Sequence, residues 1–109
     1  MIRATLLWSV LLLSQANANY FNYERWSRMT PDSRQLYIAG AFDSMVSFSA
    51  NDIESRINRH YDSCISRLKM TNMSLANNLL DYVNENPDLR GGSVQTAMIK
   101  YLIELCGRP

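Results

Sequence analysis

Four stretches of the chain place apolar side chains at steps of three and four residues, which is the spacing of one face of an α-helix. They predict helices over about 30–49, 51–68, 71–86 and 93–106. The most regular stripe, in the second stretch, is Ile53, Ile57, Tyr61, Cys64 and Leu68. No stretch shows the alternation of a half-buried strand. The pattern therefore predicts an all-α fold, a compact four-helix domain over residues 30–109.

Residues that favour helix ends flank these stretches. Thr30, Asn51, Thr71 and Ser93 stand where N-caps are expected. Glu54 follows Asn51 by three residues, as in a capping box. Gly107 follows the last apolar position and suits a left-handed helix end.

The first helix should bury one face, made of Ile38, Ala41, Phe42, Met45 and Phe48. Asp43 adjoins that face, so its carboxylate needs a partner or a chemical role. We favour a structural ion pair with Arg34 or Arg56 over catalysis.

Residues 19–29 are rich in aromatic side chains and show no clear period. The aromatic residues of this N-terminal arm are Tyr20, Phe21, Tyr23 and Trp26. Such an arm either covers the core as a lid or offers a surface to a partner. We favour the lid, formed around a short helical turn.

The first eighteen residues have the form of a secretory signal peptide. Arg3 precedes an apolar run over 6–13, and Ala16-Asn17-Ala18 is a suitable cleavage site. The run is too short to span a bilayer, which takes about 20 residues. We expect removal after Ala18, no membrane association afterwards, and a periplasmic or secreted protein.

Charge and cysteine content sharpen this picture. The whole chain has a net charge of +1, and loss of Arg3 leaves a mature chain with net charge zero. This balance argues against a nucleic-acid partner. Outside the cytoplasm, two cysteines favour a Cys64–Cys106 disulfide over a zinc site or two free thiols. With one histidine in the chain, four zinc ligands are hard to assemble.

The candidate chemistry is sparse. His60 lies one helical turn before Cys64, so a Cys–His dyad or a two-ligand metal site is one interpretation of the pair. Cys64 belongs to the predicted apolar stripe and is expected to be oxidised, which removes its thiolate. We therefore expect no catalytic residue, no cofactor and no metal, and a protein that is not an enzyme.

Three segments together resemble the Tai-type family of type VI secretion amidase immunity proteins. They are Tyr37-Ile38-Ala39-Gly40-Ala41-Phe42-Asp43, Cys64 followed by a Thr71-capped helix that ends in Tyr82-Val83-Asn84-Glu85-Asn86-Pro87, and a last helix with Tyr101-Leu102 and Cys106. The likeness covers residues 35–106, and Gly40 is expected to allow close helix packing. The family often has a further cysteine where this chain has Gln35 and Leu36.

The resemblance implies a periplasmic protein, often a homodimer, that occludes the groove of a peptidoglycan amidase. By position, the best candidate for partner contact is the loop with Asp88, Leu89, Arg90, Gly91 and Gly92. A plain helix connection is the other interpretation of this loop. The alternatives for the whole chain are an acid-stress periplasmic chaperone of the HdeA type and an exported helical protein with another role.

Overall fold

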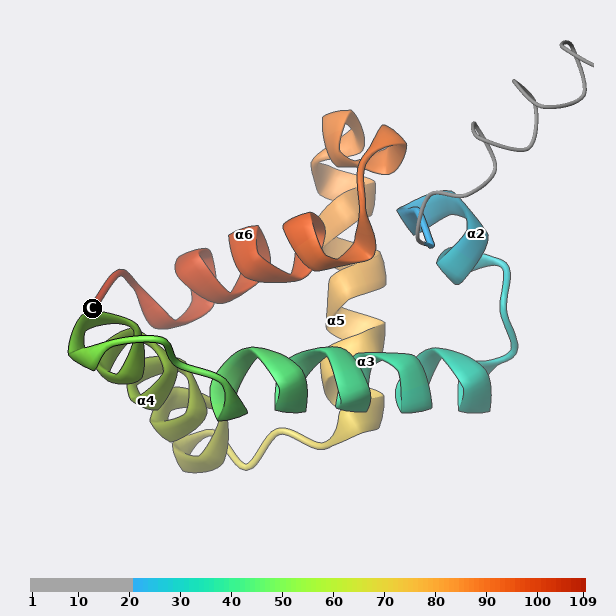
Figure 1. Cartoon of the computed structure of the whole chain (residues 1–109). Helices are drawn as coiled ribbons and strands as arrows, with labels where there is room; N and C mark the ends of the chain where they lie inside the picture. Colours follow the sequence, from blue (N-terminus) through green and yellow to red (C-terminus); the bar gives the residue numbers. More distant parts are fainter. Residues whose placement is uncertain (1–20) are drawn as a thin grey trace, which may run out of the picture.

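A computed structural model describes residues 21–109. These residues form helices that are joined by short turns (Figure 1). The predicted signal segment, 1–18, lies outside this range. The elements are α2 (Tyr23–Ser27), α3 (Pro31–Ser47), α4 (Asp52–Arg67), α5 (Asn72–Glu85), the 3₁₀ helix η1 (Pro87–Gly91) and α6 (Val94–Cys106). The all-α prediction is confirmed, with α2 and η1 added to the four predicted helices.

The helices pack around α5. Both α3 and α6 cross it, while α4 contacts α3 and α6 at one end of the molecule (Figure 1). At the other end, α2 packs against η1 and α6. The middle of the fold is therefore held between three long helices, and α4 lies at its edge.

The predicted N-caps are confirmed. The side chains of all four accept a hydrogen bond from the backbone N–H three residues further on: Thr30, Asn51, Thr71 and Ser93. The Glu54 carboxylate accepts from the N–H of Ala50 at 2.7 Å, one residue before the position that a capping box uses. Gly107 ends α6 with a φ of 75°, a conformation that favours glycine.

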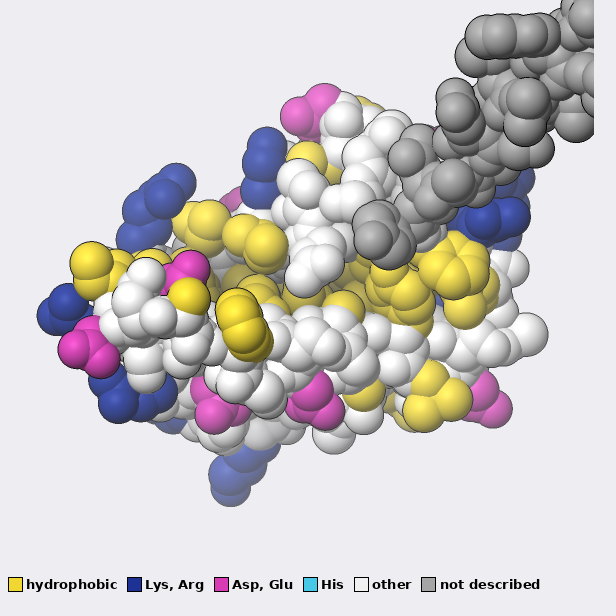
Figure 2. Space-filling model, in the orientation of Figure 1, with side chains coloured by type: hydrophobic (Ala, Val, Ile, Leu, Met, Phe, Trp, Pro, Cys, Tyr) yellow, Lys and Arg dark blue, Asp and Glu magenta, His cyan; other side chains and the backbone are white. Residues whose placement is uncertain are grey.

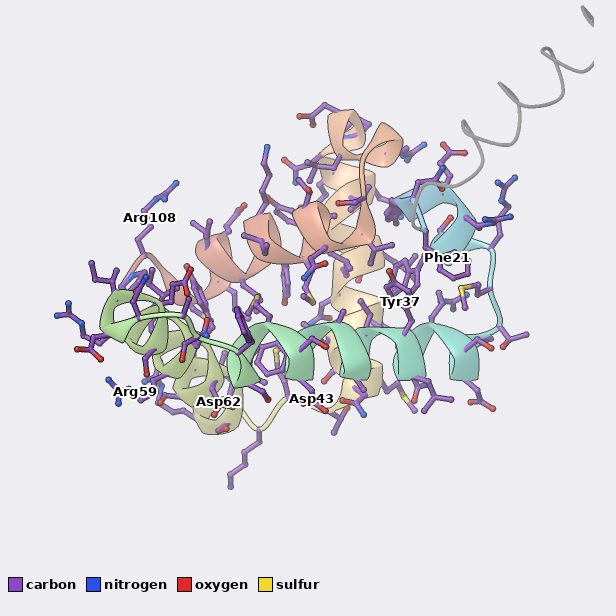
Figure 3. The ribbon with its side chains drawn as sticks, in the orientation of Figure 1. Phe21, Tyr37, Asp43, Arg59, Asp62 and Arg108 are labelled. Atoms are coloured by element: carbon purple, nitrogen blue, oxygen red, sulfur yellow. A yellow bond between two sulfur atoms is a disulfide. The ribbon has the colours of Figure 1, made fainter. Side chains whose placement is uncertain are left out.

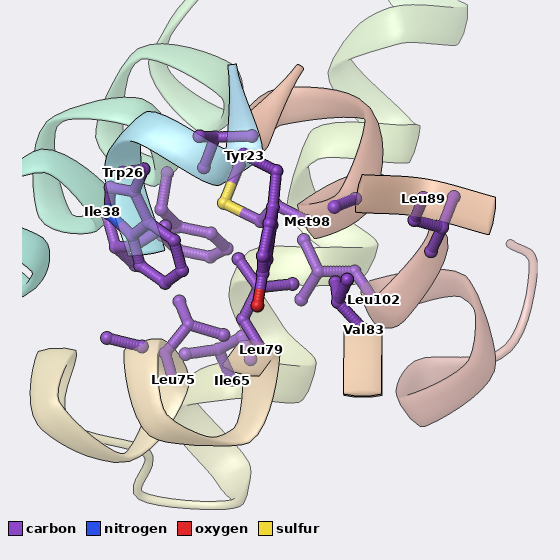
Figure 4. Packing of buried hydrophobic residues seen from close by; sticks show 14 of the residues in the cluster. Tyr23, Trp26, Ile38, Ile65, Leu75, Leu79, Val83, Leu89, Met98 and Leu102 are labelled. Carbon is purple, nitrogen blue, oxygen red and sulfur yellow. The ribbon is translucent and has the colours of Figure 1, made fainter. Parts of the chain in front are cut away.

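The core is apolar and draws on every helix. Its buried members include Trp26, Ile38, Leu79, Met98 and Leu102, which lie together in Figure 4. The buried residues of the described range include no polar or charged side chain. Burial of apolar surface therefore supplies the main stabilisation of the fold.

Two residues of the aromatic arm are part of this core, while Phe21 is exposed and Tyr20 lies outside the described residues. Tyr23 and Trp26 of α2 are buried, and the Trp26 indole donates to the carbonyl of Arg34 at 3.3 Å. The N–H of Tyr23 donates to the carbonyl of Gly92 at 2.9 Å. The lid interpretation is confirmed for these residues.

One disulfide, Cys64–Cys106, joins the last part of α4 to the end of α6, as predicted. It closes a loop with a sequence separation of 42 residues. On the chain-entropy model, such a loop contributes about 4 kcal/mol by restricting the unfolded chain. The cross-link holds the buried second half of α4 to the end of α6.

Part of the predicted apolar stripes is not buried. Phe48 is 74% exposed and Ile53 is 62% exposed, while Ile57 and Leu68 are also on the surface. The apolar spacing of these residues correctly predicted helices, but the core of the fold does not extend far enough to cover their side chains. In α4, the buried side chains are confined to Tyr61, Cys64 and Ile65.

Two predictions on α3 are wrong. Asp43 is exposed on the outer side of the helix (Figure 3), and Arg34 instead donates to the carbonyls of Ser27 and Met29. A Cβ atom at Gly40 would meet no atom within 4 Å outside its own helix turn, so no close helix packing occurs there. Both residues lie on the solvent side of α3 because its apolar face turns toward α5.

Candidate functional site

A groove lies on the surface between α5 and α6. It has a volume of about 430 Å³. The lining residues are Asn78, Asp81, Tyr82 and Glu85 from α5 and Tyr101, Glu104 and Leu105 from α6. Three of them carry a carboxylate and none carries a positive charge.

Helical spacing assembles this lining. Asn78, Asp81, Tyr82 and Glu85 fall at steps of three, one and three, so they share one face of α5. Tyr101, Glu104 and Leu105 share one face of α6 in the same way. None of these lining residues was among those predicted from the sequence to contact a partner. The spacing signal was present, but which two faces meet depends on how the helices cross.

Two tyrosines form the aromatic part of the groove. The ring centroids of Tyr82 and Tyr101 are 5.4 Å apart, and the ring planes are tilted by 57°. Both side chains are half-buried. A tilted pair at this distance leaves an aromatic surface accessible beside the carboxylates.

The groove has a negative field. Burial raises the pKa of Tyr82, and the charge of Glu104 together with its hydrogen bond to the phenol raises the pKa further. The charge of Asp88 acts in the same direction. A negative potential disfavours the phenolate and favours a bound cation, so the same field that protects Tyr82 from ionisation attracts positive charge.

The predicted contact loop lies outside this groove. Leu89 is buried in the core, so it is not part of an exposed contact, and the prediction is wrong for this residue. It is buried because η1 folds back on α5 and α2. Asp88, Arg90, Gly91 and Gly92 are exposed, but no finding links them to a partner.

Another hollow, smaller than the groove, lies between α2, α5 and η1. Its volume is about 260 Å³, and Arg90 lines it together with Glu24, Arg28 and Asn84. The Arg90 guanidinium donates to the side-chain oxygen of Asn84 at 3.2 Å. With charges of both signs and this internal contact, the hollow has a weaker preference for a charged ligand than the groove.

The Cys–His pair is not a reactive dyad. Cys64 is disulfide-bonded, and the His60 ring lies 2.8 Å from the carbonyl oxygen of Gly107 through Nε2. Residues 21–109 contain no group of three side chains suited to holding a metal ion. Within the same range, no helix is long and apolar enough to cross a bilayer.

Comparisons with protein-family models, curated proteins and solved structures found no match to this chain. The resemblance to amidase immunity proteins therefore has no further support from these comparisons.

Proposed function

We propose that this chain is an exported binding protein of the immunity type, which holds a basic segment of a protein partner in the groove between α5 and α6. The observation that carries the proposal is the composition of the groove. Asp81, Glu85 and Glu104 surround two tyrosines, and the lining contains no lysine or arginine.

This combination suits a guanidinium or ammonium group. Carboxylates accept charge-assisted hydrogen bonds from such groups, and arginine can engage a carboxylate through two parallel bonds. A tyrosine face attracts the same cations through its ring quadrupole. Tyr82 and Tyr101 therefore reinforce the preference that the carboxylates create.

The resemblance supports a protein partner. Two of its three segments meet in this groove, because Tyr82 and Glu85 come from the segment on α5 and Tyr101 from the segment on α6. A peptidoglycan amidase delivered by a neighbouring cell is the partner class that the resemblance implies. Export is supported by the signal-like first eighteen residues and by the disulfide.

Calorimetric titration of the purified, disulfide-bonded protein with a hexa-arginine peptide tests the groove. The triple variant Asp81→Asn/Glu85→Gln/Glu104→Gln should bind the peptide about tenfold more weakly or worse, a loss of at least roughly 1.4 kcal/mol. Added salt should weaken binding to the unaltered protein, because the carboxylates are near the surface.

A matched control separates the groove from net charge. Asp32→Asn/Asp43→Asn/Asp62→Asn changes the charge by the same amount at exposed positions outside the groove. This variant should keep most of the affinity. Equal losses in the two triple variants, or no binding by the unaltered protein, would contradict the assignment of the groove.

The partner class needs its own test. Amidase toxins encoded beside the gene should be inhibited by the protein and released by the groove variant, while the control variant still inhibits. If none of these amidases binds, the immunity function is wrong even where the peptide titration supports a basic ligand.

A further inference from the structure

The hollow between α2, α5 and η1 brings charges of both signs to one small concave surface. Glu24 reaches it from α2, Arg28 from the residue that ends α2, and Arg90 from η1. All three side chains are exposed, and within residues 21–109 no hydrogen bond or ion pair joins one of them to another. Figure 2 shows Lys and Arg side chains at the surface beside α2. The hollow therefore offers one negative and two positive groups that do not neutralise one another directly.

Arg90 is held in place and still has donors for a ligand. Its guanidinium donates to the side-chain oxygen of Asn84 at 3.2 Å, which ties it to the last turn of α5. A guanidinium has five N–H donors, so others remain for a second acceptor. Arginine engages a carboxylate through two parallel bonds. Arg90 is thus a positioned receptor for a carboxylate, and Arg28 lines the same hollow.

A buried hydroxyl adds a third donor. Tyr23 lines the hollow although it is only 4% exposed, and its ring extends from α2 toward α5 (Figure 4). No other group of residues 21–109 forms a hydrogen bond with its hydroxyl. Burial raises the pKa of this phenol, the charges of Arg90 and Arg34 lower it, and the charge of Asp81 raises it. The hydroxyl is therefore protonated at neutral pH. Because buried polar groups are nearly always hydrogen-bonded, a free one beside two arginines indicates a place for an acceptor.

The size of the hollow limits the ligand. Its volume of about 260 Å³ is below the roughly 300–1,000 Å³ of pockets for drug-sized molecules. Its apolar lining consists of Leu80 and the ring of Tyr23. A ligand that matches every part of this lining is small and has a carboxylate, a neighbouring ammonium group and an apolar side chain.

We propose that this hollow binds a free α-amino acid with an apolar side chain. Its carboxylate accepts from Arg28, Arg90 and the hydroxyl of Tyr23. Its ammonium group donates to Glu24, and its side chain packs on Leu80. The hollow is separate from the groove between α5 and α6, so this inference does not depend on the proposed function.

Titration of the isotope-labelled, disulfide-bonded protein with leucine, followed by NMR, tests the proposal. Binding should be weak, with a dissociation constant of roughly 1 mM, because the charged groups are exposed and water screens their ion pairs. Amide signals of residues 23–28 and 84–92 should shift and saturate. If leucine at roughly tenfold this concentration produces no saturating shift in these segments, the proposal is wrong.

Three analogues test each part of the ligand. Leucinamide lacks the carboxylate and isocaproate lacks the ammonium group, and each should bind about tenfold more weakly than leucine or worse. Glycine lacks the apolar side chain and should also bind more weakly. Isocaproate that binds as tightly as leucine would show a site for simple carboxylates and overturn the proposal. Equal binding by either of the other two would contradict the contact that it lacks.

A pair of double variants tests the location. Arg28→Gln/Arg90→Gln removes two carboxylate contacts and should weaken leucine binding about tenfold or more. Arg67→Gln/Arg108→Gln is the matched control, because it changes the charge equally at exposed positions outside the hollow. The control should bind leucine as the unaltered protein does, and circular dichroism checks that both variants keep their helices. Equal losses of affinity in the two variants would overturn the assignment.

Two single variants test the remaining contacts. Glu24→Gln should weaken the binding of leucine and leave that of isocaproate unchanged, because isocaproate has no ammonium group. Tyr23→Phe keeps the packed ring and removes the hydroxyl, so leucine should bind several-fold more weakly to a protein that is still folded. Unchanged leucine affinity in either variant would contradict the role assigned to that side chain.

Discussion

The two halves of α4 have the same apolar stripe in different surroundings. The second half contains the buried side chains of the helix, Tyr61, Cys64 and Ile65, and the disulfide joins it to α6. Ile53 and Ile57 in the first half are exposed. One helix therefore belongs to the core at one end and forms a surface at the other.

This difference shows what amphipathic periodicity means physically. The stripe determines which side of a helix is apolar, and the presence of a partner determines whether that side is buried. In the second half the partner is the rest of the chain. In the first half, the stripe lies on the surface of the described part of the chain.

Among the changes that test this comparison, loss of the disulfide should lower the free energy of unfolding the most. Cys64→Ala/Cys106→Ala removes the cross-link that holds the second half of α4 to α6. We expect the free energy of unfolding to fall by about 4 kcal/mol. Urea unfolding followed by circular dichroism measures the change. A loss below about 1 kcal/mol would show that packing alone fixes α4.

Single isoleucines in the two halves should differ next. Ile65→Ala removes a buried side chain and should cost about 2–4 kcal/mol of unfolding free energy. Ile57→Ala should cost less than about 1 kcal/mol, because much of this side chain is already in water. Equal losses of unfolding free energy in the two variants would contradict the distinction between the two halves of α4.

The smallest predicted effect concerns alkaline pH and again depends on burial. Burial raises the pKa of Tyr23, while the positive charges of Arg90 and Arg34 partly oppose this. The folded protein thus holds this proton more tightly than the unfolded chain. Stability is intact below the ordinary tyrosine pKa of roughly 10 and falls as pH rises through the raised value.

Tyr23→Phe removes this ionisation, so its unfolding free energy should decline less steeply above about pH 10. Tyr82 also has a raised pKa and contributes its own decline, which Tyr82→Phe should remove. Unfolding at several alkaline pH values measures both slopes. An unchanged slope for Tyr23→Phe would mean that its ionisation is not linked to folding.

Local features of the fold were predictable because they depend on neighbours in sequence. The caps at Thr30, Asn51, Thr71 and Ser93 act within one helical turn, and the cysteine count allowed one intramolecular pairing. The exposure of Phe48 and Ile53 was missed because it depends on where the core ends. Leu89 was assigned to the surface for the converse reason, since η1 folds it inward.

The groove could be predicted only in part. Spacing alone places Asp81, Tyr82 and Glu85 on one face of α5, and Tyr101 and Glu104 on one face of α6. That these two faces meet follows from the crossing of α5 and α6, which depends on packing throughout the core. The local sequence of α5 and α6 therefore does not determine how the two helices cross.

Amide hydrogen exchange of the disulfide-bonded protein tests the contrast within α4 most directly. We predict that amides around Cys64 are strongly protected, while amides around Ile57 exchange faster because the first half of the helix lies at the edge of the core. Equal protection in the two halves would contradict the account.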